Sequence, residues 1–357
     1  MNAPKDGSVH RHFAGLRIYP ALMHRRTALG CLAVLAIAPW ARAAPTSRDE
    51  RLSALLDEAG ELPSLETVIV SLKGDRIAAR AYRGHSVSRA TNIKSVSKSI
   101  ISAMVGMAID RDLLKGADQP IAPSLARDLP SDPDPRLQAI TIGNLLSMQA
   151  GLQRMSGPNY GRWVSSGNWV RSALAAPFSD DPGGGMLYST ASTHLLSAIL
   201  TRVGRKSTLA LARDWFGPLD GFSIYGWERD PQGIYLGGNQ MAMTPRSLLT
   251  FGELYARGGI TRDGTRLLSQ QWIDQSWTPR TSSVFTGDSY GYGWFLRDMD
   301  GEAVRYGWGY GGQMLDVVPA LGLTVVMTSD DENPSGRTGY RDRLHALMTG
   351  IIAAAKA

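Results

Sequence analysis

A serine and a lysine stand three residues apart at the start of an apolar stretch. Ser95 and Lys98 lie in "TNIKSVSKSIISAMVGMAID", residues 91–110. In a helix, residues i and i+3 share a face and side chains lean toward the N-terminus, so Lys98 leans over Ser95, whereas Lys94 leans away from Ser97. The spacing therefore favours Ser95 with Lys98 as a nucleophile and its base.

This pairing has a chemical reason and a simpler alternative. A serine hydroxyl needs an adjacent base, and a lysine serves when burial lowers its pKa toward 7. The apolar run after Lys98 predicts such burial, and a helix N-terminus near Ser95 suits a developing oxyanion. An ordinary capped helix start would carry the same residues, and 32 serines and 7 lysines give about 0.6 S-x-x-K matches by chance. Spacing alone leaves both interpretations open.

Other catalytic patterns are missing from the sequence. After the N-terminal leader only His85, His194 and His345 remain, none in a metal-ligand spacing such as H-E-x-x-H, and there is no G-x-S-x-G motif. We interpret each histidine as structural. No metal or organic cofactor is implied.

The elements that must position Ser95 and Lys98 follow from periodicity. Residues 48–60 have helical spacing, and two strand-like runs follow at 66–74 and 76–84 around a Gly-Asp turn. Helical patterns fill the middle of the chain, and strand-like runs fill its last third before a helix from about Arg341 to Ala355. Strands at both ends with helices between them predict an α/β (α+β) fold with a mainly antiparallel sheet.

The middle of the chain contains an irregular, aromatic segment from Gly151 to Gly185. A loop of this length without its own structure is usually functional. We expect residues 154–185 to close over a substrate, and a helical subdomain of about 95–220 to be inserted in the sheet subdomain.

The leader carries most of the positive charge of this 357-residue chain. Residues 1–43 hold six Lys and Arg against one acid, a balance of +5, which leaves about +1 of the overall +6 for the rest. Nucleic-acid binding is therefore not expected. Arg25 and Arg26, an apolar run and an A-x-A site before Ala44 indicate an export signal, of twin-arginine type, with Met23 as a possible true start.

The only cysteine, Cys31, lies inside this signal. The mature chain, residues 44–357, would then have no disulfide and no thiol nucleophile. No later segment has the roughly 18 consecutive apolar residues of a membrane helix. The expected location is periplasmic or secreted, with a small-molecule substrate as partner.

Five stretches in order carry a resemblance. They are "SVSK" (95–98), "ITIGNLLSMQAGL" (140–152), "PGGGMLYSTASTHLLSAIL" (182–200), "MAMTPRSLLTFGELYARGG" (241–259) and "YGWGYGGQMLDVVPALGLTVVMTSD" (306–330). Together they resemble the serine β-lactamase and penicillin-binding-protein superfamily, and within it the class C-like esterases and 6-aminohexanoate-dimer hydrolases. The resemblance implies a β-lactamase/transpeptidase-like fold, with terminal helices flanking the sheet.

The resemblance also implies roles for single residues. Ser95 matches the acylated nucleophile, Lys98 its general base, and Tyr188 in "LYST" the tyrosine that shuttles a proton to the leaving group. "GWGYGG" matches the family's K-T-G or H-x-G strand, so the backbone N–H groups of Tyr310 and Ser95 are the expected oxyanion hole. Further expected substrate-binding residues are Gly309, Trp308 and Asn239. Trp308 either lines the acyl pocket or packs under the loop.

Departures from the family pattern narrow the substrate. In "GWGYGG", Trp308 is flanked by glycines, and there is no Lys or His to meet a substrate carboxylate. In addition, Thr190 replaces the Asn of the family's Y-x-N motif. A β-lactam carboxylate would lose a charge-assisted hydrogen bond of roughly 1.5–3 kcal/mol. The expected function is hydrolysis of linear amides or carboxylic esters through an acyl-enzyme. The alternatives are a β-lactamase or D,D-peptidase, or a non-hydrolytic penicillin-binding or peptidoglycan-sensing module.

Overall fold

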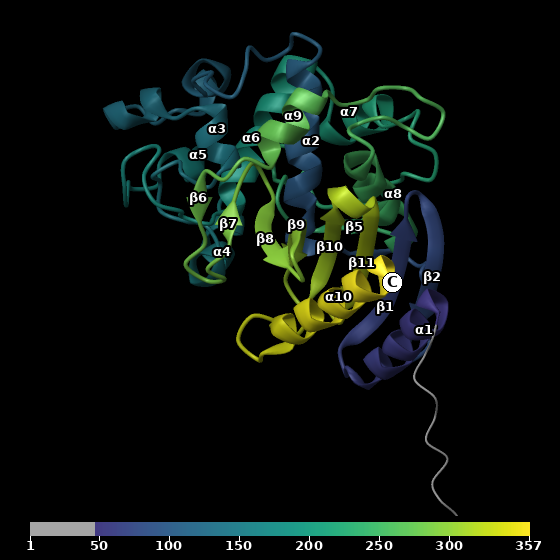
Figure 1. Ribbon diagram of the computed structural model, residues 1–357. Coiled ribbons are helices and arrows are strands. Elements are labelled where there is room, and N and C mark those ends of the chain that lie inside the picture. Colours follow the sequence, from purple (N-terminus) through teal and green to yellow (C-terminus); the bar gives the residue numbers. More distant parts are fainter. Residues whose placement is uncertain (1–46) are drawn as a thin grey trace, which may run out of the picture. The chain divides into compact units, whose positions relative to one another are not determined.

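An eight-stranded sheet joins the two ends of the described chain (Figure 1). Its strand order is β2-β1-β11-β10-β9-β8-β7-β6, and every neighbouring pair is antiparallel. The strands are β1 Leu65–Leu72, β2 Asp75–Ala81, β6 Thr281–Ser282, β7 Ser289–Tyr290, β8 Phe295–Met299, β9 Glu302–Gly309, β10 Gln313–Val318 and β11 Leu323–Ser329. The computed structural model describes residues 47–357, and the expected export signal with Cys31 lies outside the described residues.

The first hairpin shows why these strands form. β1 has the sequence LETVIVSL, rich in residues that favour a half-buried strand. Lys73 and Gly74 both have positive φ, 53° and 89°, which is the conformation of a two-residue turn whose twist matches the strands. The predicted turn is therefore present, although it is centred on Lys73–Gly74.

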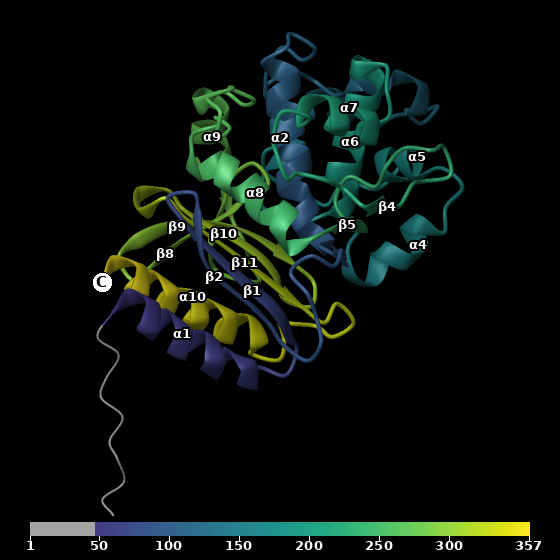
Figure 2. The ribbon, with the colours of Figure 1, turned by 90° about the vertical axis from the view of Figure 1, so that its right-hand side faces the viewer.

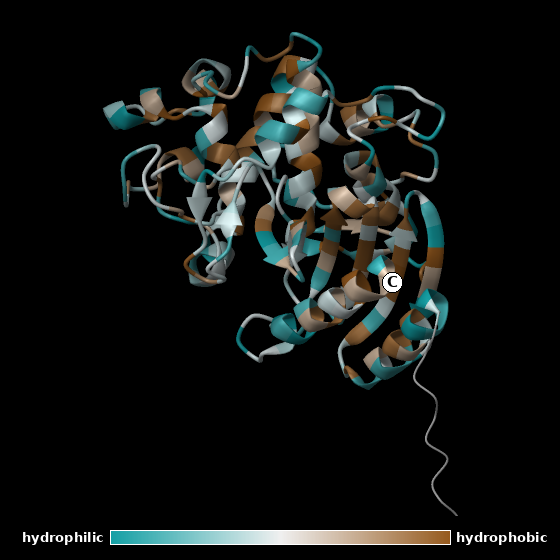
Figure 3. Ribbon diagram, viewed as in Figure 1, coloured by the Kyte–Doolittle hydropathy of each residue, from teal (hydrophilic) through white to brown (hydrophobic). Residues whose placement is uncertain are grey.

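The two faces of the sheet are covered by different helices (Figure 2). Helices α1 (Arg48–Glu58) and α10 (Tyr340–Lys356) pack against each other on one face, and α8 (Pro245–Ala256) contacts β1, β10 and β11 on the other. Alternate residues of β10 divide accordingly: Met314 and Val318 belong to the core under α10, and Leu315 belongs to the core under α8. Hydrophobic residues gather on the central strands of the sheet, whereas hydrophilic and hydrophobic residues alternate along α1 and α10 (Figure 3).

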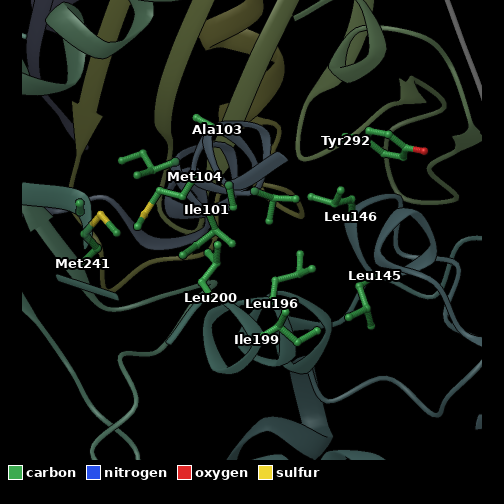
Figure 4. Close-up of a cluster of buried hydrophobic side chains, with 14 of the residues drawn as sticks. Ile101, Ala103, Met104, Leu145, Leu146, Leu196, Ile199, Leu200, Met241 and Tyr292 are labelled. Carbon is green, nitrogen blue, oxygen red and sulfur yellow. The ribbon is translucent and has the colours of Figure 1, made fainter. Parts of the chain in front are cut away.

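The middle of the chain is mainly helical and is organised around α2 (Ser97–Ile109). Every α2 residue from Ser97 to Ala108 is buried. Leu145, Leu196, Ile199 and Leu200 pack around its Ile101 and Met104 (Figure 4). The other helices are α3 Ile142–Leu146, α4 Tyr160–Val164, α5 Trp169–Leu174, α6 Thr190–Gly204, α7 Thr208–Trp215 and α9 Gln270–Ser276.

Short elements complete the described chain. Three strands form a second sheet in the order β3-β5-β4, with β3 Thr91–Asn92, β4 Gly226–Trp227 and β5 Met241–Met243. The 3-10 helices are η1 Ala59–Glu61, η2 Lys94–Val96, η3 Ala122–Asp128, η4 Pro135–Ala139, η5 Gly157–Asn159 and η6 Pro319–Leu321. Because β3 runs directly into η2, the small sheet fixes the chain just before Ser95.

The expected α/β class and the antiparallel sheet are confirmed. The segment from Gly151 to Gly185 differs from the irregular loop that we expected, since it contains η5, α4 and α5. Its tryptophans explain this: Trp163 and Trp169 are buried, so short helices form where they turn inward. The boundary of a helical subdomain at about 95–220 stays a prediction. Within residues 47–357, no helix is both long and apolar enough to cross a bilayer.

Candidate active site

Ser95 lies in the 3-10 turn η2, directly before α2. The residue before it, Lys94, has φ 48°, a left-handed conformation that costs free energy in a non-glycine residue. The turn is tied on both sides, because the Lys94 N–H donates to Asn92 Oδ1 (3.0 Å) and Ser97 Oγ donates to the Lys94 carbonyl (2.8 Å). Ser95 itself stays partly exposed, with its backbone N–H in a first turn where amides have no acceptor within the helix.

Lys98 is held against Ser95 as its spacing predicts. Its Nζ donates to Ser95 Oγ at 2.9 Å and to the Gly238 carbonyl at 2.6 Å, and the side chain is only 1% exposed. Burial lowers the pKa of Lys98 to about 7. A substantial fraction of this amine is therefore neutral near pH 7 and able to accept a proton.

Gly238 supplies a contact that sequence reasoning missed. A Cβ there would lie 3.0 Å from Lys98 Nζ and would collide with Thr193 Oγ1. Only glycine lets this backbone come close enough for its carbonyl to accept from the amine. The Gly-Gly pair before Asn239 was the available signal.

Tyr188 completes the group around Ser95. Its ring centroid lies 5.0 Å from Lys98 Nζ, and its hydroxyl is close enough to Ser95 for that side chain to influence its pKa. The ring packs on Phe295 and Tyr290, each at 6.2 Å between centroids. Burial raises the pKa of Tyr188 to about 12, although the neighbouring Ser95 side chain acts in the opposite direction. Tyr188 is therefore a neutral phenol near pH 7, which can donate a proton but is a poor general base.

The end of β9 approaches the turn that carries Ser95. A Cβ on Gly307 would lie 3.1 Å from Val96 Cγ1, and one on Gly309 would lie 2.6 Å from the Ile93 carbonyl oxygen. These glycines let the strand edge lie against η2. Tyr310 follows immediately, half-exposed, so its backbone is beside the turn where an oxyanion hole with Ser95 is expected.

Trp308 points away from the face of β9 that meets η2. Strand alternation puts it opposite Gly307 and Gly309. Its Nε1 donates to Ser335 Oγ (3.1 Å), and its ring lies 5.2 Å from the Arg341 guanidinium carbon. The structure thus brings Trp308 against the segment before α10, and its contact with substrate stays a prediction.

Asn239 lies next to the Gly238 carbonyl that binds Lys98. Its Nδ2 donates to the Tyr160 hydroxyl at 3.3 Å, whereas its buried Oδ1 has no partner within residues 47–357. Asn239 is thus near the site on the side of α4. Its contact with substrate also stays a prediction.

An ion pair beneath the site had no sequence signal. Lys94 Nζ lies 2.9 Å from Asp331 Oδ2. A Cβ on Gly311 would lie 2.8 Å from the Asp331 Cα and would collide with the Asp330 carbonyl oxygen. The pair therefore links the strained residue before Ser95 to the segment that packs behind the β9–β10 hairpin.

Two of the three histidines, His194 and His345, are buried, whereas His85 is partly exposed with its Nδ1 3.5 Å from Glu66 Oε1. His194 Nε2 lies 3.1 Å from Asp230 Oδ2, both side chains are buried, and Trp163 and Trp169 flank the imidazole. Burial lowers the pKa of His345 to about 4. No group of three or more His, Cys, Asp or Glu residues in the described part of the chain is arranged to hold a metal ion.

Known structures share this fold at low sequence identity. A proposed 6-aminohexanoate-dimer hydrolase from Bacillus anthracis has a TM-score of 0.67 at 18% identity, covering 85% of this chain and 81% of its own. A penicillin-binding protein homologue from Caulobacter crescentus has 0.69 at 15%, covering 87% and 98%. D-amino acid amidase from Ochrobactrum anthropi, complexed with L-phenylalanine amide, has 0.68 at 15%, also covering 87% and 98%.

Sequence comparison identifies the family directly. No curated protein sequence gives a significant match. The family model described as Beta-lactamase matches residues 52–348, which include Ser95, Lys98, Tyr188 and the β9–β10 hairpin. The chain therefore belongs to the Beta-lactamase family.

Proposed function

We propose that this protein is a serine hydrolase that cleaves linear amides or carboxylic esters through an acyl-enzyme on Ser95. The observation that carries the proposal is the buried Lys98 amine, 2.9 Å from Ser95 Oγ. A base with a pKa near the working pH is well matched to deprotonating a hydroxyl. The family membership of the chain supports hydrolase chemistry.

The contacts support a division of roles between Lys98 and Tyr188. Lys98 takes the Ser95 proton as Oγ bonds to the substrate carbonyl carbon, and the backbone N–H groups of Ser95 and Tyr310 stabilise the oxyanion. The C–N or C–O bond then breaks as the leaving atom takes a proton from the Tyr188 hydroxyl, which Lys98 replenishes. Water attacks the acyl-enzyme, gives a proton to Lys98, and the proton returns to Ser95 Oγ as the acid leaves.

The choice of amides and esters as substrates is supported by the absence of a Lys or His in "GWGYGG", the stretch that matches the family's K-T-G or H-x-G strand. Trp308 stands where the family has a cation for a β-lactam carboxylate, and its indole is turned toward Ser335 and Arg341. The structural neighbours include a proposed 6-aminohexanoate-dimer hydrolase and an amidase. Both names describe hydrolysis of linear amides.

Mass spectrometry tests the nucleophile. Residues 44–357 are treated with a fluorophosphonate probe beside the Ser95→Ala variant, and turnover of p-nitrophenyl butyrate and a 6-aminohexanoate dimer is then measured. We expect one adduct that maps to Ser95 and disappears in the variant, with turnover of at least one substrate. An unlabelled Ser95 in a folded protein would contradict the proposal.

A β-lactamase or D,D-peptidase is the second candidate. It is favoured by the family model itself and by the penicillin-binding protein homologue among the neighbours. Colour release from a chromogenic cephalosporin distinguishes it from an amidase or esterase. A penicillin adduct that persists for hours would instead indicate a non-hydrolytic penicillin-binding module.

We also propose that the enzyme acts in the periplasm or outside the cell. The support is the leader sequence with Arg25 and Arg26. Fractionation of cells that express the full chain should place the mature protein outside the cytoplasm, and replacing both arginines by lysine should retain it inside. Cytoplasmic retention of the unaltered chain would contradict export.

A further inference from the structure

Exposed apolar side chains gather in two segments beside the candidate active site. Five large apolar side chains are exposed within residues 47–357, and three of them are Val284, Phe285 and Tyr310. Arg341 links the two segments, since its Nη1 donates to the Phe285 carbonyl (3.4 Å) and its guanidinium lies over the ring of Trp308. An apolar surface of this kind, next to a nucleophile, suits an apolar part of a substrate.

A cation without an acidic partner lies over this surface. The Arg154 guanidinium carbon is 5.1 Å from the Phe285 ring centroid. Within residues 47–357 the Arg154 guanidinium has no ion pair with a carboxylate and no side-chain hydrogen bond, and its aromatic contact is the Phe285 ring. A guanidinium that meets an aromatic face keeps its planar fork of N–H donors available for a carboxylate.

Both partners of this contact are anchored next to Tyr188. The N–H of Met155, adjacent to Arg154, donates to Ser189 Oγ at 2.9 Å, and Ser189 follows Tyr188. Bond lengths then limit the Cα separation of Arg154 and Tyr188 to at most about 12 Å. On the other side, the Phe285 loop leads into Tyr290, whose ring packs on Tyr188. Arg154 and Phe285 thus meet between two segments that each contact residues at or beside Tyr188.

We propose that Arg154 and Phe285 form a subsite for a carboxylate carried by the leaving group on an apolar spacer. This inference rests on the proposed function, in which Tyr188 protonates the leaving atom. The leaving group therefore departs on the Tyr188 side, where its spacer can lie along Phe285 and its carboxylate can meet the Arg154 fork. The family's cation is absent at Trp308, and in this proposal a cation from the segment before α4 takes its role.

A matched pair of substrates tests the subsite. One is the butyryl ester of 6-hydroxyhexanoic acid, and the other is the same ester with the carboxylate replaced by a primary amide. The acyl group and the spacer are identical, so the ratio of their kcat/KM values reports the carboxylate. A charge-assisted contact at a partly exposed site should give a ratio of about 10 in favour of the acid.

Two arginine variants test whether Arg154 causes the preference for the substrate that carries the carboxylate. Arg154→Gln should reduce the ratio to about 1. Arg76→Gln, which removes an exposed arginine from β2 at the far edge of the sheet, should keep it. Equal rates for the two substrates in the unaltered enzyme, or a ratio that survives Arg154→Gln, would overturn the subsite.

A binding measurement separates failure of the subsite from failure of the proposed function. Hexanoate and hexanamide are compared as protectors of Ser95 against the fluorophosphonate probe. Hexanoate should protect at about tenfold lower concentration than hexanamide, and Arg154→Gln should equalise the two. Labelling with equal protection in the unaltered protein would overturn the subsite alone, whereas absence of labelling would overturn the proposed function and the subsite with it.

Discussion

Two buried ionisable groups lie on opposite sides of the large sheet and differ in what surrounds them. Lys98, on α2, is on the side of β9 that carries Gly307, and Asp316, on β10, is on the side covered by α10. Burial moves both toward the neutral form: it lowers the pKa of Lys98 to about 7 and raises the pKa of Asp316 to about 8. The same physical effect therefore acts on a base and on an acid.

The hydrogen-bond partners separate the two regions. Lys98 Nζ has two oxygen acceptors, Ser95 Oγ and the Gly238 carbonyl, whereas neither carboxyl oxygen of Asp316 has a partner within residues 47–357. Desolvation at Lys98 produces a usable base beside a hydroxyl. At Asp316 it only destabilises the fold, because a buried carboxyl without partners loses its hydration. The comparison shows that burial makes an ionisable group reactive only where hydrogen bonds hold it next to a reacting atom, as they hold Lys98 next to Ser95 Oγ.

Removing the side chains of the candidate active site should have the largest effects on turnover. Ser95→Ala should abolish turnover, and Lys98→Ala and Tyr188→Phe should each lower kcat at least a hundredfold, because each removes a proton-transfer group. Steady-state kinetics with p-nitrophenyl butyrate measures the losses. Near-normal activity of Lys98→Ala would contradict the role of Lys98 as the base for Ser95, on which the comparison with Asp316 depends.

Loosening the support of Ser95 should have a smaller effect. Asp331→Asn removes the charge partner of Lys94, whose left-handed backbone precedes the nucleophile. We expect kcat to fall roughly tenfold with little change in KM, since misplacement of a nucleophile affects the chemical step. Asp214→Asn breaks the exposed Lys206 pair and serves as a matched control with unchanged kinetics. Equal kinetics in both variants would show that the Lys94–Asp331 pair does not position Ser95.

Neutralising Asp316 should change stability and leave catalysis alone. The folded-state pKa is raised above the ordinary value near 4, so the folded protein keeps a proton that the unfolded chain releases, and stability falls as pH rises from about 4 to about 8. Asp316→Asn should therefore raise the free energy of unfolding, measured in urea, by about 1 kcal/mol or more over the parent protein at pH 8. Near pH 4 the two proteins should have nearly equal free energies of unfolding. The exposed Asp57→Asn variant is the control. A variant that is less stable than the parent at pH 8 would mean that the carboxylate has a favourable role.

The sequence was informative where local periodicity determines structure. The alternating, β-branched β1 and the Gly-containing turn after it predict a hairpin, and the i, i+3 rule places Lys98 over Ser95. Tyr188 was reached through its resemblance to a family motif. Its position beside Lys98 and Ser95 comes from tertiary structure, because Tyr188 is far from both residues in sequence.

Long-range contacts account for what the sequence did not predict. The Gly238 carbonyl lies 140 residues from Lys98, and no local pattern relates Asp331 to Lys94 or Phe285 to Arg154. The helices α4 and α5 were missed because glycine and serine dominate their surroundings. Their formation depends on burying Trp163 and Trp169, which tertiary packing decides.

The central claim is that burial makes Lys98 the base for Ser95, and the pH dependence of Ser95 labelling tests it most directly. Because Lys98 must be neutral to accept a proton, the rate of fluorophosphonate labelling should be low at acid pH, rise through a pKa of about 7, and level off above it. In Lys98→Ala the rate of Ser95 labelling should be very low at every pH, so that its rise near pH 7 disappears. A labelling rate that does not change between pH 5 and pH 9, or one that is retained in Lys98→Ala, would contradict the account.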